Sequence, residues 1–375
     1  MKRVLLTFAA TLGLWAAAAQ QTPESAGTDC PATQPAEVAC TAEALPQPTP
    51  VYPPARWNKV LERLPRVSGY AQLGYEGGTD VSTFLVKRVR LILAGDLAPK
   101  LGYRVQLELL APRMVDAFID YRPLRQLKLK AGEFKIPFTI ENTDYTPLNM
   151  EFIEYPMGLT RLMGLNDLCG MKNTGRDLGA MIYGGFGCRD CDRDVVSYDI
   201  AVLNGEGLNV RDANKSKDVV ARVMVRPVRG LTLAGYVYRG EFGKECMRRT
   251  RYGGGAAYDR GRGVVRGEWI GGRTGSLKSE GWYAMGGVRF DHGLMAALRY
   301  DTFIEDRDAA STRRRNYTAG LSWQPLRYFR CQLDYTYEYY AAAGVRDRNV
   351  VAVLLTGMFC RRPRSAPGRS VPPLP

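Results

Sequence analysis

Residues 101–109 alternate between apolar and polar side chains over nearly their whole length. Leucine, tyrosine or valine occupies each odd position, whereas Arg104, Gln106 and Glu108 lie between them. A period of two is that of a β-strand, whose successive side chains point to opposite faces. A strand with one apolar and one ionic face suits a wall between lipid and water, and about sixteen segments of roughly ten residues repeat this pattern. The sequence therefore predicts an all-β fold, a transmembrane β-barrel.

The expected strands form one antiparallel series, five before and eleven after a long interruption. An even number of strands places both ends of the barrel on one side of the membrane, which we assign to the periplasm. Tight turns such as 227–230 and 324–327 then alternate with longer outer connections. The sixteen expected segments are 67–75, 84–94, 101–110, 114–122, 127–134, 177–185, 195–203, 218–226, 231–240, 251–258, 264–271, 281–290, 294–303, 316–323, 328–338 and 348–359.

The connection 135–175 is much longer than the others. It contains Pro137, Pro147 and Pro156, several aromatic residues and an expected helical turn at 150–154. A connection of this length needs a role. Because a barrel of sixteen strands is wide enough for an aqueous channel, we expect this third outer loop to fold inward as a constriction. Packing on the outside of the barrel is the alternative.

The two ends of the chain differ in composition from the strands. Lys2 and Arg3 precede an apolar run that ends on small residues, which is typical of a signal peptide, and the run is shorter than the ~20 residues of a membrane-spanning helix. We expect a signal peptide at 1–19, a Pro-rich periplasmic linker at 20–64, the barrel at 65–359 and a disordered basic, Pro-containing tail at 360–375.

The chain is basic, with a formal net charge of +14. Such a charge is compatible with nucleic acid, anionic lipid or small anions as partners. Export argues against nucleic acid, and the basic residues alternate with apolar ones along strands instead of forming one patch. We therefore expect contact with outer-membrane lipid and small anions, and no nucleic acid.

Eight cysteines occur, and in an exported chain they are expected to form disulfides. Cys188 and Cys191 form a Cys-x-x-Cys motif, but no second ligand pair is near and the sole histidine, His292, is distant in sequence. A local or inter-loop disulfide is therefore preferred to a metal site, and no cofactor is expected. A bridge between Cys169 and Cys246, both in expected outer loops, is another candidate.

Eight short motifs, spaced like the strands, resemble those of a known family. They are Phe-x-x-Lys-Arg-Val-Arg-Leu at 84–91, Asp-Ala-Phe-Ile-Asp-Tyr at 116–121, Gly-Glu-Phe-Lys-Ile-Pro-Phe at 132–138, Gly-Arg-Asp-Leu-Gly at 175–179, Asn-Gly-Glu-Gly-Leu-Asn at 204–209, Lys-Asp-x-x-Ala-Arg-Val at 217–223, Arg-Tyr-Asp at 299–301 and Tyr-Thr-x-Gly-Leu at 317–321. Over nearly the whole barrel the chain resembles the phosphate-selective porin O and P family of Gram-negative outer membranes.

This resemblance implies a trimeric, sixteen-stranded outer-membrane channel whose third outer loop forms the constriction. It also implies the outer-membrane insertion machinery as a partner. The chain departs from the family pattern in its Pro-rich amino-terminal segment and in the residues that follow Phe359.

Strand parity predicts which basic side chains face the lumen. In the second expected strand, Val89 and Leu91 facing lipid put Arg88 and Arg90 inside. An arginine fork fits phosphate oxygens, and a wall of individually weak contacts lets anions enter and leave. The anion-binding candidates are Arg88, Arg90, Arg104, Lys128, Lys130, Lys135, Arg222, Arg226, Arg266, Arg299 and Arg330.

The same parity brings acidic residues into the lumen, where they are alternative partners for these cations. They are Glu108, Asp116, Asp120, Asp199, Glu268, Asp301 and Asp334. Because the lumen charge leans positive, the sequence predicts a porin, not an enzyme, that gives passive diffusion with a preference for anions. The family resemblance implies small anions such as phosphate. A non-selective porin and a structural or adhesion barrel are the alternatives. A hydrolase at the barrel rim is the least favoured, since the only histidine lies in a periplasmic turn.

Several aromatic residues fall near strand ends or at lipid-facing positions. Amphipathic rings at such positions settle at the headgroup level of a membrane. The residues expected in these girdles are Trp269, Tyr317, Trp323, Tyr328, Tyr335 and Tyr337.

Overall fold

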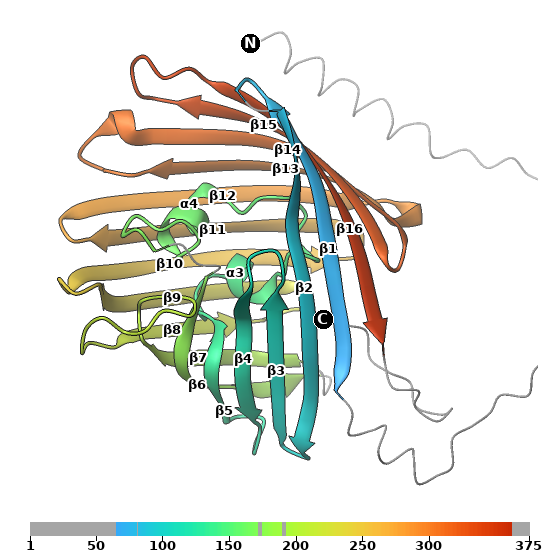
Figure 1. Cartoon of the computed structure of the whole chain (residues 1–375), viewed down its shortest axis with the longest axis vertical. Helices are drawn as coiled ribbons and strands as arrows, with labels where there is room; N and C mark the ends of the chain where they lie inside the picture. The colour runs from blue at the N-terminus through green and yellow to red at the C-terminus, as the bar shows by residue number, and fades with distance from the viewer. Residues whose placement is uncertain (1–64, 81, 172–174, 190–192, 362–375) are drawn as a thin grey trace, which may run out of the picture. The chain divides into compact units, whose positions relative to one another are not determined.

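The strands close into a barrel. The computed structural model describes residues 65–80, 82–171, 175–189 and 193–361. Within them, sixteen antiparallel strands each pair with their neighbours in sequence, and β1 closes the sheet on β16 (Figure 1). The expected sixteen-stranded antiparallel barrel is therefore confirmed. The expected signal peptide (1–19), the linker (20–64) and nearly all of the tail (360–375) lie outside the described residues.

Each of the sixteen expected segments forms one strand, and most strands extend beyond the expected bounds. The second strand, for example, runs to Ala98 instead of ending at residue 94. The strands are β1 (Arg66–Gly78), β2 (Ser82–Ala98), β3 (Leu101–Glu108), β4 (Arg113–Tyr121), β5 (Lys128–Lys135), β6 (Arg176–Arg189), β7 (Arg193–Leu203), β8 (Asp218–Val225), β9 (Leu231–Phe242), β10 (Met247–Arg260), β11 (Gly263–Thr274), β12 (Leu277–Arg289), β13 (Leu294–Ile304), β14 (Arg313–Leu326), β15 (Phe329–Tyr340) and β16 (Arg348–Arg361).

Burial along the strands is the inverse of that in a water-soluble protein. Polar lumen-facing side chains are buried, as for Gln72 at 0% and Arg266 at 1% exposure, whereas Leu298 is 67% and Val265 is 59% exposed. Large apolar side chains exposed in rows face lipid, and the polar groups of the other face find partners inside the barrel.

A β-bulge between β1 and β2 changes the alternation that the sequence suggests. Gln72 pairs with Arg88 and Leu73 pairs with Val86, so Lys87 is the extra residue on β2. Strict alternation would place Lys87 on the lipid face with Val89. The bulge instead lets Lys87 reach Glu154 inside the barrel, so that two consecutive cations face the lumen.

The connections at one end of the barrel are short and those at the other end are longer. In bacterial outer-membrane barrels the long connections are extracellular, and the orientation used below follows this rule. The longest one, residues 136–175 between β5 and β6, is called L3 below; it contains α3 (Ile140–Asp144) and α4 (Met157–Leu162). Single-turn helices η1 (Asp291–Gly293) and η2 (Ala310–Thr312) lie in two other connections. No helix in the described ranges is long and apolar enough to cross a membrane.

Candidate channel constriction

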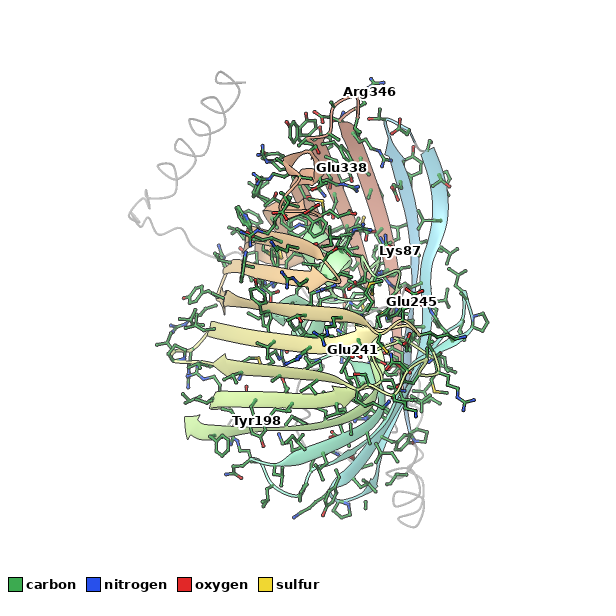
Figure 2. All side chains as sticks on the ribbon, turned by 90° about the vertical axis from the view of Figure 1, so that its left-hand side faces the viewer. Lys87, Tyr198, Glu241, Glu245, Glu338 and Arg346 are labelled. Carbon is green, nitrogen blue, oxygen red and sulfur yellow. The ribbon has the colours of Figure 1, made fainter. Side chains whose placement is uncertain are left out.

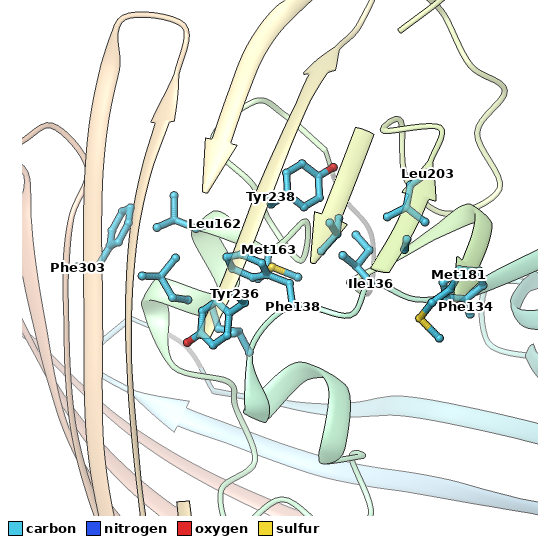
Figure 3. Packing of buried hydrophobic residues seen from close by; sticks show 14 residues of the cluster. Phe134, Ile136, Phe138, Leu162, Met163, Met181, Leu203, Tyr236, Tyr238 and Phe303 are labelled. Atoms are coloured by element: carbon cyan, nitrogen blue, oxygen red, sulfur yellow. The ribbon is translucent and has the colours of Figure 1, made fainter. Parts of the chain in front are cut away.

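L3 lies inside the barrel and packs against its inner wall. Its buried side chains Phe138 and Leu162 belong to an apolar cluster with Leu203, Tyr236 and Phe303, which are lumen-facing residues of β7, β9 and β13 (Figure 3). The ring centroids of Phe138 and Tyr236 lie 4.6 Å apart. L3 therefore covers the inner face of the β7–β13 wall and narrows the lumen, as expected from its length.

Wall carboxylates accept hydrogen bonds from backbone amides of L3. Glu268 accepts from the amides of Ile140 and Glu141 at 2.6 and 2.9 Å, at the start of α3. Asp334 accepts from Ile153 N at 2.7 Å, and Asp301 accepts from Met157 N at 3.1 Å, where α4 begins. The first amides of a helix have no partner within it and carry a partial positive charge, so a carboxylate is well suited to hold them.

Wall cations hold the carbonyl and carboxylate groups of L3. Arg330 donates to the carbonyl oxygens of Leu148 and Met150, both at 2.8 Å. Lys135 donates to two carbonyl oxygens of L3 at 2.7 Å. The Glu151 carboxylate of L3 pairs with Arg266 of the wall. Residues 150–154 form no helix. The helical turn expected there is wrong, because the wall contacts fix an irregular backbone.

Arg266 makes the densest set of contacts with L3. Its guanidinium pairs with Glu141 at 2.5 Å and with Glu151, and it lies 3.7 Å from the centroid of the Tyr145 ring. Arg222 likewise joins Asp199 of the wall, at 2.7 Å, to Asp144 of L3 at 3.1 Å. These buried pairs position the loop.

The anion-binding candidates fall into three groups according to their partners. Five are in ion pairs: Arg90 with Glu108, Arg104 with Asp116, Arg222 with Asp199 and Asp144, Arg266 with Glu141 and Glu151, and Arg299 with Asp301. Lys135 and Arg330 bind carbonyl oxygens of L3. Within the described ranges, Arg88, Lys128, Lys130 and Arg226 have no carboxylate at ion-pairing distance.

These four residues are called the unpaired cations below. Arg88 donates to the Gln72 amide oxygen at 2.8 Å, and Arg226 donates to the Ser197 hydroxyl at 2.8 Å. Lys130 lies 4.7 Å from the centroid of the Phe118 ring, and Lys128 lies 5.4 Å from that of Tyr183. The direct partners of these cations are neutral, although Asp120 of β4 lies directly opposite Lys130 on the neighbouring strand.

A cavity of about 190 Å³ separates the tip of L3 from the wall formed by β1, β2 and β13–β16. Glu154 and Tyr155 of L3 line one side, and Lys87 pairs with Glu154 across the space. The other charged residues of the lining are Arg299, Arg348, Glu76, Asp334 and Glu338. Figure 2 labels Lys87 on β2 and Glu338 on β15. This cavity is a part of the lumen that L3 does not fill, and both basic and acidic side chains line it.

Sequence reasoning missed the acidic residues of L3 and the cation at the bulge. Glu141, Asp144 and Glu151 are the partners of Arg222 and Arg266, yet nothing in a strand pattern brings a loop carboxylate to a wall residue far along the chain. Lys87 carried a signal, because two adjacent basic residues interrupt the alternation of β2 and such interruptions are typical of bulges.

The candidate bridge between Cys169 and Cys246 is wrong, since both thiols are free. Cys191 and the side chain of Cys188 lie outside the described residues, so their expected disulfide stays a prediction. Cys169 lies in L3 beside Arg249, whose guanidinium nitrogen is 3.5 Å from the sulfur. Burial, together with the Asp167 carboxylate, raises the pKa of the Cys169 thiol to about 11.

We expect Cys169 to react much more slowly than Cys246 with a maleimide at pH 7.5. Thiolate is the reactive form, so a raised pKa leaves a very small reactive fraction, whereas Cys246 is exposed. Mass spectrometry of peptides from labelled native protein measures both rates, and denatured protein is the control in which both should label. Equal rates in the native protein would contradict the half-buried position of Cys169.

Comparison with known proteins identifies a family that matches part of the chain and solved structures that share its fold. The family model of phosphate-selective porin O and P matches residues 68–242. No curated protein sequence matches the chain significantly. An anion-selective porin from Comamonas acidovorans is 12% identical, with a TM-score of 0.61 over 78% of this chain and 98% of that one.

Two further solved structures share the fold. A trimer form of in-vitro folded OmpT, an outer membrane protein of Vibrio cholerae, is 12% identical with a TM-score of 0.57, covering 78% of this chain and 98% of that one. Salmonella typhi OmpF in complex with daunomycin is 12% identical with a TM-score of 0.54, covering 80% and 98%. This chain is therefore an outer-membrane porin of the Gram-negative type, and over residues 68–242 it belongs to the phosphate-selective porin O and P family.

Proposed function

We propose that this porin lets small hydrophilic solutes diffuse passively across the outer membrane and that it prefers anions, phosphate or similar anions among them. The observation that carries the proposal is the set of unpaired cations, Arg88, Lys128, Lys130 and Arg226, on the lumen face of β2, β5 and the end of β8. The fold and family indicate a channel rather than an enzyme.

The placement of the unpaired cations supports passage rather than tight binding. Lys128 and Arg226 belong to the periplasmic half of the lumen, because short turns at that end connect β4 to β5 and β8 to β9. Arg88 lies next to the bulge of β2, whose extra residue Lys87 lines the cavity that L3 leaves open. Charges spread along a path lower the entry barrier for an anion, while no one contact is strong enough to stop its exit.

The second candidate function is a non-selective general porin. The cavity lining favours it, because Glu76 and Asp334 have no cation at ion-pairing distance within the described part of the chain. Their negative charge opposes that of the unpaired cations. We favour the anion-preferring function because the four unpaired cations outnumber these two carboxylates.

Assembly and insertion are part of the same proposal. We propose a homotrimer, supported by the trimer form of the structurally similar Vibrio cholerae protein, and insertion into the membrane by the outer-membrane insertion machinery. The aromatic residue for recognition by that machinery is Phe359, which lies in β16.

Addition of inorganic phosphate is expected to lower the chloride conductance of the channel in a planar lipid bilayer. Phosphate carries more charge than chloride and accepts several hydrogen bonds, so it dwells longer at Arg88. The Arg88→Gln variant should lose much of this inhibition. The double variant Arg90→Gln/Glu108→Gln is the matched control, because it removes a neighbouring ion pair without changing the net lumen charge. The absence of any conductance would contradict the porin, and chloride conductance indifferent to phosphate would contradict the phosphate-like class of solute.

A further inference from the structure

The lumen face of β4, β5 and β6 carries aromatic rings where a water-filled channel usually has polar side chains. Phe118 of β4 and Tyr183 of β6 face inward, because their neighbours Ile119 and Ile182 are exposed on the lipid face. Both rings are half-buried, whereas Phe134 of β5 is fully covered, at 2% exposure. Phe118 and Tyr183 are therefore apolar surfaces that solutes in the lumen can reach.

The two rings lie at the edge of the apolar cluster that L3 covers. Phe134 and Met181 belong to that cluster, and Figure 3 shows them together at one end of it. Phe118 and Tyr183 pack against the same cluster but keep part of their surface exposed. The apolar surface beneath L3 thus continues along the wall to two rings that L3 does not fully cover.

Two of the unpaired cations lie over these rings. The Lys130 ammonium is 4.7 Å from the centroid of the Phe118 ring and 5.1 Å from that of Tyr183, and the Lys128 ammonium is 5.4 Å from that of Tyr183. Their two-residue spacing on β5 puts both lysines on one face. An ammonium over a neutral ring is held more weakly than one paired with a carboxylate, so an incoming carboxylate can recruit it.

The acidic residues nearest to the lysines already have partners. Asp120, directly opposite Lys130, accepts the Tyr183 hydroxyl at 2.5 Å and lies 3.8 Å from Arg122. Asp199, directly opposite Tyr183, pairs with an arginine of β8 at 2.7 Å. The bond to Asp120 also fixes the position of the Tyr183 ring. These acids shape the surroundings of the two ammonium groups and leave both groups over the rings.

We propose that Phe118, Tyr183, Lys128 and Lys130, called the ring site below, bind anionic solutes that carry an aromatic ring, of which aromatic carboxylates are the simplest. The carboxylate pairs with the two ammonium groups, and the ring of the solute packs edge-to-face or offset against Phe118 and Tyr183. The inference rests on the proposed anion preference and names one class of anion that the lumen retains. A small inorganic anion meets only the charges of this site, whereas an aromatic carboxylate also removes apolar surface from water.

The block of chloride current by three carboxylates tests the ring site, with the wild-type channel in a planar lipid bilayer at neutral pH. Benzoate should block at about tenfold lower concentration than acetate, because both offer the same carboxylate and only benzoate adds a ring contact. Cyclohexanecarboxylate controls for apolarity, since its ring has no aromatic face. It should block more weakly than benzoate.

Variants assign the block to the named residues. Phe118→Leu keeps an apolar side chain and removes the ring, so it should bring the benzoate block close to the acetate block. Lys128→Gln/Lys130→Gln should weaken the block by both acids. Phe186→Leu is the matched control, because Phe186 is on the lipid face of β6, 50% exposed and stacked on Tyr198. The control should keep the wild-type benzoate block.

Several results would overturn the ring site. They are equal block by benzoate and acetate, wild-type benzoate block in Phe118→Leu, or an equal loss in Phe186→Leu. Equal block by benzoate and cyclohexanecarboxylate would make the contact merely apolar and would overturn the aromatic class of solute. Any of these results in a channel that still prefers chloride leaves the proposed function intact, whereas a preference for potassium contradicts the proposed function itself.

Discussion

Replacing all four unpaired cations, Arg88, Lys128, Lys130 and Arg226, with glutamine is expected to abolish the anion preference of the channel. A unit charge 4 Å from a passing ion contributes between about 1 kcal/mol, as in bulk water, and about 4 kcal/mol, as near a protein surface. Because 1.4 kcal/mol corresponds to about a tenfold change, the anion-to-cation permeability ratio should fall by about tenfold or more. Reversal potentials in a potassium chloride gradient measure this ratio.

The matched control removes the same number of charged groups without changing the net charge of the lumen. Arg90→Gln/Glu108→Gln combined with Lys87→Gln/Glu154→Gln neutralises two lumen pairs. This control is expected to keep the wild-type sign of the reversal potential. If both variants shift the potential equally, selectivity depends on general wall structure and the unpaired cations have no special part in it.

Replacing Arg266 with methionine is expected to release L3 from the wall. The substitution leaves Glu141 and Glu151 as buried carboxylates without a cation, next to Glu268. Removing one partner of a buried ion pair typically costs about 3–5 kcal/mol. We therefore expect a larger and noisier single-channel conductance together with a lower unfolding temperature, measured in bilayers and by thermal denaturation in detergent.

Two companion variants separate this effect from a general loss of charge. Arg262→Met removes an exposed pair with Asp291, at the periplasmic end just before β11, and is expected to change neither conductance nor stability appreciably. Arg266→Lys keeps a positive charge but offers a single ammonium to two carboxylates, so an intermediate conductance is expected. A wild-type conductance in Arg266→Met would show that the apolar packing of L3 suffices to hold it.

The strands were predictable because their signal is local. Each side chain of a membrane strand meets either lipid or lumen, so alternation alone reveals both the strand and its inner face. Parity correctly placed Arg222, Arg266 and Arg330 inside, where each contacts L3. It failed at Lys87, because a bulge inserts one residue and shifts the register of the strand beyond it.

The use of the lumen charges was not predictable from the same pattern. Whether Arg266 meets a solute or Glu141 depends on how a loop of L3's length folds back on the wall, and the two residues are 125 positions apart. The structure shows that much of the arginine-rich inner face serves to hold L3. The basic side chains predicted to face the lumen therefore do face it. Far fewer of them lack a carboxylate partner than the sequence suggested.

The zero-current potential of the wild-type channel in a potassium chloride gradient tests the central claim most directly. Purified protein in a planar bilayer, with a tenfold higher salt concentration on one side, should give a potential whose sign corresponds to greater chloride permeability. This result is predicted because the unpaired lumen cations outweigh the carboxylates of the cavity. A potential of the opposite sign, showing potassium to be the more permeable ion, would contradict the account.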